Sequence, residues 1–260
     1  MIHRAPISFP GGPTPGARPR ASAFTLLELL VVLALLLGAL RALLLPTLAA
    51  GRDYAKVAAC LSNTRQLGMA WTMYFNDSDD SFPMWSRNVQ WFYGGTDPAL
   101  YNPLYQYPTR PLNPYVGLEL EDSRGLTVFQ CPADRDIRSG ITGKTHTQGH
   151  DTYTFYGNSY MLNTTLVPRV LNKESPYYGR SITLQDFQIS HSRLILLGDV
   201  QWYYTVFNAH WDAKFHNTDR SLPLAFVDGH AKHTPMTRGE TITDDYSLSF
   251  LKPLPAEEGT

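Results

Sequence analysis

Apolar residues gather most densely near the N-terminus of this 260-residue chain. Residues 29–40 carry no polar side chain, while Glu28 stands just before them and Arg41 just after them. The 22 residues from position 24 to position 45 would form a helix about 33 Å long, close to the thickness of the hydrocarbon core of a bilayer. The pattern therefore predicts a membrane-spanning helix over residues 24–50, with one carboxylate near its start.

A second helical pattern follows directly, over residues 51–75. Apolar residues recur there at intervals of three and four positions, as in an amphipathic helix: Tyr54, Val57, Ala58, Leu61, Leu67, Ala70, Trp71 and Tyr74. The pattern ends in N-D-S-D-D-S-F-P, where Asp and Ser compete for backbone hydrogen bonds and Pro83 prevents continuation. Residues 76–80 place oxygen side chains at alternate positions, as a calcium loop does, but without its glycine and closing glutamate. We interpret this segment as a helix stop and predict no cofactor, with calcium as the alternative.

Beyond the helix the pattern changes to short segments. Residues 76–125 are rich in Pro, Gly and aromatic residues without a regular period, which predicts a long ordered loop with a short helix near residues 112–116. Within residues 126–237, apolar or aromatic runs predict strands at 126–130, 153–162, 194–197, 202–207, 222–227 and 231–234. Asp228-Gly229 predicts a hairpin between the last two strands. The expected fold is α+β, a long N-terminal helix packed on an antiparallel sheet of about four to six strands, with a C-terminal tail at 238–260.

The aromatic residues of the loop over residues 84–125 permit two interpretations. They can pack onto the core of the same domain, or they can form a face that binds a ligand. Loops of this length are often functional, but aromatic side chains are more often buried than used for binding. We favour packing and keep the binding face as the alternative.

Charge excludes one class of function. The chain has 22 Lys and Arg residues against 23 Asp and Glu residues, for a net charge of -1. Such a balance gives no field that would attract a nucleic acid, and we predict no nucleic-acid partner.

The chain contains two cysteines, Cys60 and Cys131. A domain exported behind a membrane segment lies where disulfides persist, so we predict a Cys60–Cys131 bridge. Two unpaired buried thiols remain the alternative.

The residues before the apolar stretch carry a recognisable motif. Residues 1–23 form a basic leader with Arg4, Arg18 and Arg20 and no acidic residue, and A-F-T-L-L-E follows at positions 23–28. This resembles the processing site of type IV pilin-like proteins, in which a small residue, usually Gly, precedes a Phe that becomes the new N-terminus. Here Ala23 stands in place of that Gly. The resemblance implies cleavage after Ala23 and methylation of the Phe24 amine by a prepilin peptidase/methyltransferase.

Three further blocks are similar to those of pilin-like proteins with a C-terminal His…Asp-Gly motif: C-P-A-D at 131–134, Y-G-N-S-Y-M-L-N at 156–163 and F-V-D-G-H at 226–230. In that subgroup nine residues separate the His from Asp-Gly. Here eleven residues, 217 to 227, separate His216 from Asp228, so the spacing is two residues longer.

A physical role for Glu28 can be argued without reference to any family. A charge within an apolar span is expensive and calls for a partner. After cleavage the Phe24 ammonium needs an anion, and Glu28 of one subunit can meet the ammonium of the next and fix the axial register of a helical bundle. The alternative is that Glu28 simply lies at the headgroup boundary, where its charge costs little.

One cluster of residue types suggests catalysis or metal binding: His210, Asp212, His216, Asp228, His230 and His233. Imidazoles and carboxylates at this density can bind zinc. However, the sequence has no H-E-x-x-H or G-x-S-x-G motif, and Asp228-Gly229 suits a turn. We favour a structural role for these residues and predict that the chain is not an enzyme, with an exported metal-dependent hydrolase as the competing hypothesis.

Together these patterns predict a structural subunit. The resemblance implies a single-pass inner-membrane precursor, with its soluble domain over 51–237 outside the cytoplasm, that assembles with like subunits into a type II secretion pseudopilus or type IV pilus-like fibre on an inner-membrane assembly platform. The alternative is a membrane-tethered binding protein that does not polymerise.

Overall fold

The structure is a computed structural model, and its description covers residues 25–83, 89–96, 110–117, 127–139, 147, 149–166, 181–207, 211–212, 215–216 and 221–249. Ala23, Phe24, His210 and the end of the tail lie outside these residues, as does much of the loop over 84–125. The chain divides into two compact units, residues 1–49 and residues 50–260, which are described separately.

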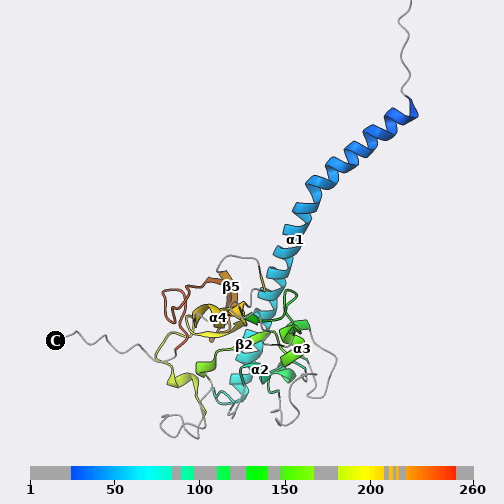
Figure 1. The fold of residues 1–260 in the computed structure, drawn as a ribbon. Coiled ribbons are helices and arrows are strands. Elements are labelled where there is room, and N and C mark those ends of the chain that lie inside the picture. Colours follow the sequence, from blue (N-terminus) through cyan, green and yellow to red (C-terminus); the bar gives the residue numbers. More distant parts are fainter. Residues whose placement is uncertain are drawn as a thin grey trace, which may run out of the picture. The chain divides into compact units, whose positions relative to one another are not determined.

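Helix α1 (Leu26–Asp77) supplies the described part of the first unit and the first element of the second (Figure 1). Its N-terminal part is long and apolar enough to cross a bilayer, and it is the one such helix among the described residues. The two helical patterns of the sequence therefore form one continuous helix. It ends at Asp77, two residues beyond the predicted stop, where Asp79 and Asp80 adopt left-handed φ values of 47° and 58°.

The second unit contains a four-stranded antiparallel sheet in the order β2-β3-β5-β6. Its strands are β2 (Tyr160–Leu162), β3 (Ile195–Asp199), β5 (Ser221–Phe226) and β6 (Ala231–Pro235). A smaller sheet pairs β1 (Arg138–Ser139) with β4 (Trp211–Asp212). A long helix with a small antiparallel sheet confirms the predicted α+β class, and β5 and β6 form the predicted hairpin.

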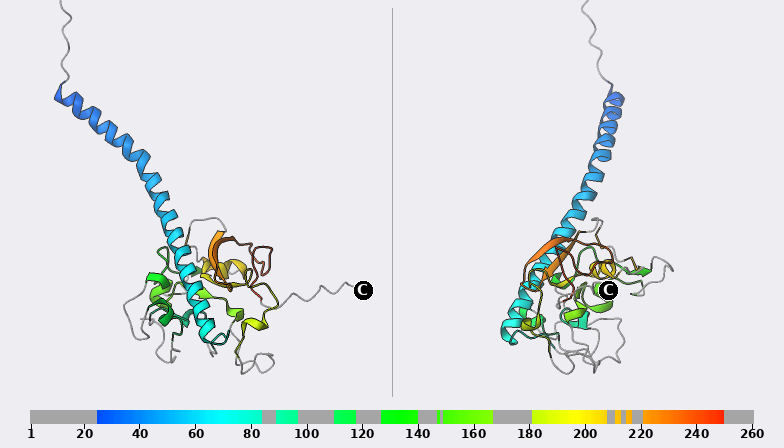
Figure 2. Two further views of the ribbon diagram at one scale, coloured as in Figure 1. Left: turned by 180° about the vertical axis from the view of Figure 1, so that it is seen from behind. Right: turned by 90° about the vertical axis from the view of Figure 1, so that its left-hand side faces the viewer.

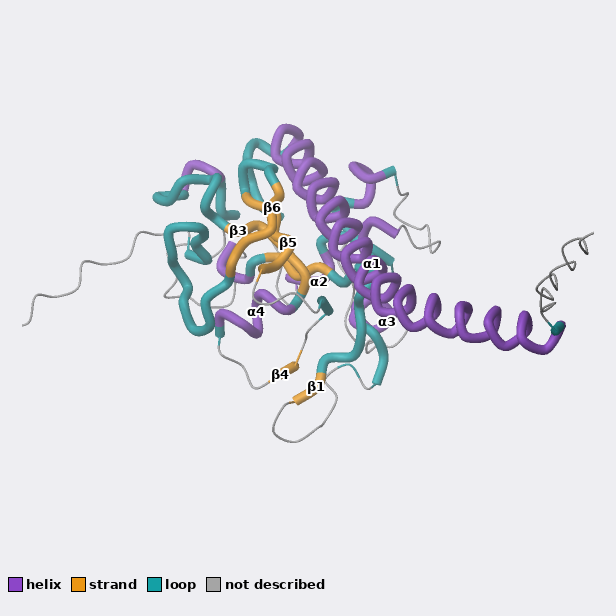
Figure 3. The backbone as a smooth tube through the Cα atoms, turned by 90° about the horizontal axis from the view of Figure 1, so that it is seen from above, coloured by secondary structure: helices purple, strands orange, loops and turns teal. Residues whose placement is uncertain are grey.

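The C-terminal half of α1 packs along this sheet, as the views in Figures 2 and 3 show. One face of the helix is buried through residues spaced three and four apart: Val57, Cys60, Thr64, Leu67, Trp71 and Phe75. The opposite face, with Met69 and Met73, is exposed. The core of this unit is therefore built between the buried face of α1 and the sheet. The periodicity predicted this face, but it wrongly included Tyr54 and Ala58, which are exposed.

Short helices connect these elements. They are α2 (Val89–Phe92), η1 (Asn113–Val116), η2 (Thr127–Phe129), α3 (Thr152–Tyr156), η3 (Thr164–Leu166), η4 (Leu184–Asp186) and α4 (Gln201–Val206). The helix predicted near 112–116 is present as the 3-10 helix η1.

Two strand predictions are wrong, and a third is correct only in part. Residues 126–130 contain the 3-10 helix η2, and residues 202–207 lie largely in α4. Residues 153–162 form a strand only at their C-terminal end, because α3 occupies their start.

Local side-chain contacts explain two of these differences. The Asp151 carboxylate accepts a hydrogen bond from the Thr154 backbone N–H and so caps α3, which Gly157 ends at a φ of 77°. At the start of α4, the Asp199 carboxylate accepts from the Gln201 N–H. In each segment a preceding Asp satisfies a free N–H of the first turn, and this outweighs the strand preference of the aromatic residues.

The described aromatic residues of the loop over 84–125 pack inward. Trp91, Phe92 and Tyr93 are buried, and the Tyr93 hydroxyl donates to the Tyr160 carbonyl at 3.1 Å. Arg110 is buried beside them and donates to the Gly94 carbonyl at 2.5 Å. Within the described residues, packing onto the core is therefore the correct interpretation of these aromatics.

Candidate functional site

Thr25 and Glu28 form a closed hydrogen-bonded unit at the start of α1. The Thr25 N–H and hydroxyl donate to Glu28 Oε2 at 2.9 and 3.0 Å, and the Glu28 N–H donates to Thr25 Oγ1 at 3.2 Å. This is a capping box, in which two polar residues three apart satisfy free N–H groups of the first turn. The T-x-x-E spacing is visible in the sequence, but only the charge of Glu28 was considered there, so its capping role was not predicted. Phe24 lies outside the described residues.

No described residue of the first unit covers the apolar side chains that follow. From Leu26 to Leu48 the large apolar residues of α1 are between 46% and 75% exposed. So much exposed apolar surface on one helix is unfavourable in water, and such a surface marks a contact with lipid or with another protein.

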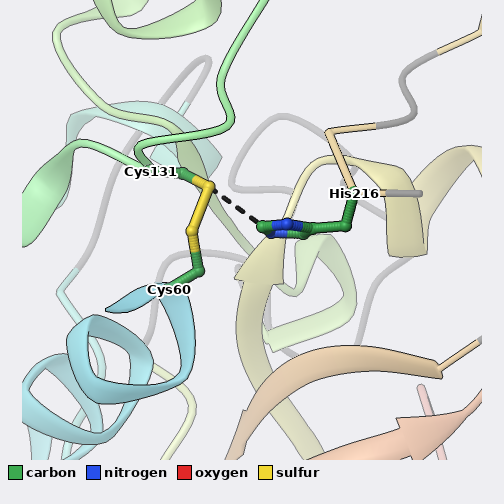
Figure 4. Close-up of side chains that lie close together, drawn as sticks. All are labelled: Cys60, Cys131 and His216. Atoms are coloured by element: carbon green, nitrogen blue, oxygen red, sulfur yellow. Dashed lines mark hydrogen bonds between the residues drawn. A yellow bond between two sulfur atoms is a disulfide. The ribbon is translucent and has the colours of Figure 1, made fainter. Parts of the chain in front are cut away.

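In the second unit, α1 is joined covalently to the segment before α3. Cys60 on the buried face of α1 forms a disulfide with Cys131, with the two Cα atoms 5.3 Å apart (Figure 4). This confirms the predicted bridge. It connects residues 71 positions apart, so the attachment of α1 to the rest of the unit does not depend on packing alone.

His216 lies against this disulfide. Its Nε2 atom is 3.5 Å from Cys131 Sγ (Figure 4) and 3.6 Å from Asp199 Oδ2, and all three side chains are buried. Asp199 stands at the end of β3, where its Oδ1 accepts from the Gln201 N–H. Its Oδ2 has no hydrogen-bond partner among the described residues. A single imidazole nitrogen therefore faces both a buried sulfur and an unsatisfied carboxylate oxygen.

Burial moves the two titratable groups toward their neutral forms. It raises the pKa of the Asp199 carboxyl to about 7, with a further contribution from the nearby Asp134 charge. It lowers the pKa of the His216 imidazole to about 4, and the His233 and Arg135 charges add to this. At pH values between these two, a protonated carboxyl faces a neutral imidazole.

Asp134 of the C-P-A-D block is the neighbouring acid. It accepts from the Ser159 hydroxyl at 2.5 Å and from the backbone N–H groups of Thr152 and Tyr153 at 3.0 and 2.7 Å. Burial nevertheless raises its pKa to about 6, because the loss of water outweighs these bonds. Asp134 thus holds the start of α3 and the segment before β2 in place.

A cavity of about 280 Å³ opens beside His216. Its lining mixes charges of both signs with apolar groups: Asp53, Lys56, Pro132, Ala133, Asp134, Arg135, Phe215 and His216. Pro132 directly follows Cys131, so the cavity reaches the vicinity of the disulfide.

The histidine cluster predicted from the sequence does not assemble as one site in the described residues. His230 Nδ1 lies 2.6 Å from Asp228 Oδ1 in the β5–β6 turn, and its ring stacks on Phe226. His216 instead lies beside the disulfide, while the Asp212 backbone pairs with Arg138. Where the chain is described, the His, Cys and acidic residues whose ligand atoms all lie within 4.8 Å of one another are Cys60, Cys131 and His216.

Comparison with protein-family models, with curated proteins and with solved structures found no match.

Proposed function

We propose that this chain is the precursor of a pilin-like subunit that is anchored in the membrane by α1 and then assembles through that helix into a pseudopilus or type IV pilus-like fibre. The observation that carries the proposal is the combination of A-F-T-L-L-E at 23–28 with the exposed apolar side chains of residues 26–48. Lipid covers such a helix before assembly, and the helices of like subunits cover it afterwards.

Processing releases the helix for assembly. The motif supports cleavage after Ala23 and methylation of the new amine on Phe24, both by a prepilin peptidase/methyltransferase. Cleavage removes the basic leader, which carries Arg4, Arg18 and Arg20 and would oppose movement of this end of the chain into a fibre core.

Glu28 then sets the register between subunits. A carboxylate has about four acceptor sites. The two bonds from Thr25 to Oε2 leave acceptor capacity for the Phe24 ammonium of a neighbouring subunit. A subunit that enters out of register would leave this carboxylate and that ammonium without their ionic partners in an apolar bundle, at a cost of several kcal/mol.

The disulfide of the second unit supports one orientation in the membrane. Disulfides persist outside the cytoplasm, so the Cys60–Cys131 bridge supports a topology with the leader in the cytoplasm and residues 50–260 on the far side of the inner membrane. The assembly platform in that membrane is the implied partner. Among the described residues of the loop over 84–125, Trp91, Phe92 and Tyr93 are buried and offer no exposed face for the tethered binding protein of the alternative hypothesis.

Mass spectrometry of the N-terminus of membrane-extracted protein tests the proposal. We expect a chain that begins at Phe24 and carries one added methyl group. An Ala23→Gly variant, which restores the usual residue at this position, should be processed at least as completely. A chain that begins at residue 1, or one cut near residue 50 behind the apolar segment, would rule the proposal out. Chemical crosslinking in membranes distinguishes the two hypotheses, because a fibre subunit should give a ladder of oligomers and a tethered monomer should not.

A further inference from the structure

Fibre assembly makes no use of the buried polar groups around the disulfide. Cys60, Cys131, His216 and Asp199 come from four separate parts of the second unit and are each at most 3% exposed. Two sulfurs, an imidazole and a carboxylate are the ligand types that zinc takes in proteins. Buried groups of this kind usually have a complete set of hydrogen bonds, and this set does not.

Two distances around His216 are close to those of a tetrahedral metal centre. With ordinary zinc–ligand bond lengths, a thiolate sulfur and an imidazole nitrogen are about 3.6 Å apart, and an imidazole nitrogen and a carboxylate oxygen about 3.4 Å apart. The Nε2 atom of His216 lies 3.5 Å from Cys131 Sγ and 3.6 Å from Asp199 Oδ2. Two of the six ligand–ligand distances are therefore already close to their required lengths, while Asp199 lies outside the group of Cys60, Cys131 and His216, whose ligand atoms are all within 4.8 Å of one another.

The distance between the two sulfurs requires the disulfide to open. Two thiolates on one zinc ion are about 3.8 Å apart, so the sulfurs must separate by about 1.7 Å from their bonded distance. The Cα atoms of Cys60 and Cys131 are 5.3 Å apart, and rotation of the two side chains can provide this separation without moving the backbone far.

Asp199 supplies the independent observation that points to a ligand. Its Oδ2 atom is buried, has no hydrogen-bond partner among the described residues and faces His216 Nε2. A metal ion bound to Nε2 would give that oxygen a partner. The cavity lined by His216 and Pro132 borders one side of the proposed site.

We propose that the reduced form of this protein binds one Zn²⁺ ion through Cys60, Cys131 and His216, and that the Asp199 side chain moves toward the sulfurs to become the fourth ligand. A phosphine reductant opens the site: the sulfur–sulfur bond breaks, phosphorus is oxidised to the phosphine oxide with an oxygen from water, and the two hydrogens of that water end on the sulfurs. Zinc then displaces the two thiol protons into solvent, together with the Asp199 proton where that carboxyl is protonated. The ion keeps α1 attached to the segment at Cys131 when the covalent bond is absent.

Zinc binding to the full-length protein in detergent micelles tests this. The protein is reduced with a trialkylphosphine, its two thiols are counted, the reductant is removed without oxygen, and zinc is added. We expect about one tightly bound zinc per chain in the reduced protein and none in the oxidised protein. With Co²⁺ in place of zinc, we expect the visible bands of a tetrahedral ion and a sulfur-to-cobalt charge-transfer band.

Variants distinguish a zinc site that uses His216 and Asp199 from zinc that is bound by the two thiols alone. His216→Ala should weaken zinc binding by at least about 100-fold, and Asp199→Asn by more than about tenfold. His230→Ala is the matched control, because His230 pairs with Asp228 in a turn, and it should bind zinc as the unaltered protein does.

The proposal fails if the reduced protein, with two thiols counted, binds no zinc, or if His216→Ala binds zinc as tightly as the unaltered protein. If reduction unfolds the second unit, zinc must restore its circular dichroism spectrum, and failure to do so also overturns the proposal. None of these outcomes affects fibre assembly, which depends on residues 23–48.

Discussion

Gly68 of α1 lies directly against Gly229 of the β5–β6 turn. A Cβ atom on Gly68 would be 3.0 Å from the Gly229 carbonyl oxygen, and a Cβ atom on Gly229 would be 2.7 Å from Thr72 Oγ1. The Thr72 hydroxyl in turn donates to the Gly68 carbonyl at 3.1 Å. The Asp228-Gly229 turn therefore does more than reverse the chain, because its backbone fits against the backbone of the helix.

This contact predicts that Gly229→Ala destabilises the second unit. Gly229 has a φ of 86°, where an L-residue is strained by about 1–2 kcal/mol, and overpacking against Thr72 adds about 1 kcal/mol or more. Gly239→Ala is the matched control, since Gly239 has a φ of 81° but open space around its Cβ position. Urea unfolding should show a larger loss for Gly229→Ala, and equal losses would mean that the contact with α1 contributes nothing.

The disulfide predicts a second stability effect. Replacing both Cys60 and Cys131 with Ser should lower the free energy of unfolding by about 4 kcal/mol, because the bridge closes a long loop between positions 71 apart. The comparison should be made by urea unfolding with a metal chelator present. Reduced unaltered protein under the same conditions is the control and should approach the double variant. A double variant as stable as the oxidised protein would contradict the expectation.

The features predicted correctly from the sequence are those with a strong local or countable signal. The buried face of α1 follows a period of three and four residues, and the β5–β6 hairpin follows from Asp228-Gly229 between two apolar runs. The chain contains two cysteines, so Cys60–Cys131 was the one disulfide that could form within the chain.

The features that were mispredicted depend on single side chains or on distant contacts. Residues 202–206 are aromatic and β-branched and suit a strand, but α4 forms there, with Asp199 accepting from the Gln201 N–H and the Trp202 ring buried in the core. The position of His216 was not predictable in the same way, because its neighbours Cys131 and Asp199 are distant in sequence and no local pattern connects them.

Asp199 predicts a pH-dependent difference between the protein and its Asp199→Asn variant. Folding raises the pKa of this carboxyl from 3.8 to about 7, so the folded state binds more protons than the unfolded state between those values. The contribution of Asp199 to stability therefore falls as pH rises from about 4 to 7. Asparagine keeps the acceptor for the Gln201 N–H without the charge. The stability of Asp199→Asn relative to the unaltered protein should rise over this range by on the order of 2–4 kcal/mol.

His216 works in the opposite direction, because its folded pKa of about 4 lies below its ordinary value of 6.5 and stability from this group rises with pH. His216 is present in both proteins, but it lies 3.6 Å from Asp199, so the measured difference is the net effect of the pair. Asp244→Asn, at an exposed carboxyl, controls for the general loss of a negative charge. Urea unfolding at several pH values provides the measurement, and a difference that stays constant from pH 4 to 7 would show that Asp199 is not held in an unfavourable site.

The capping role of Glu28 and its proposed role in fibre assembly can be separated by substitution. Glu28→Gln keeps a side chain of the same size and an oxygen that can accept from Thr25, so the cap is largely preserved while the charge is lost. Thr25→Val removes the hydroxyl that takes part in the cap and leaves the charge in place. If Glu28 fixes register through a neighbouring ammonium, Glu28→Gln should reduce the crosslinked oligomer by more than about tenfold, since an unpaired buried charge costs several kcal/mol. Thr25→Val should reduce it only a little, because losing a cap costs about 1 kcal/mol. Both variants should reach the membrane at unchanged levels. The reverse order of effects would assign Glu28 to capping rather than to register.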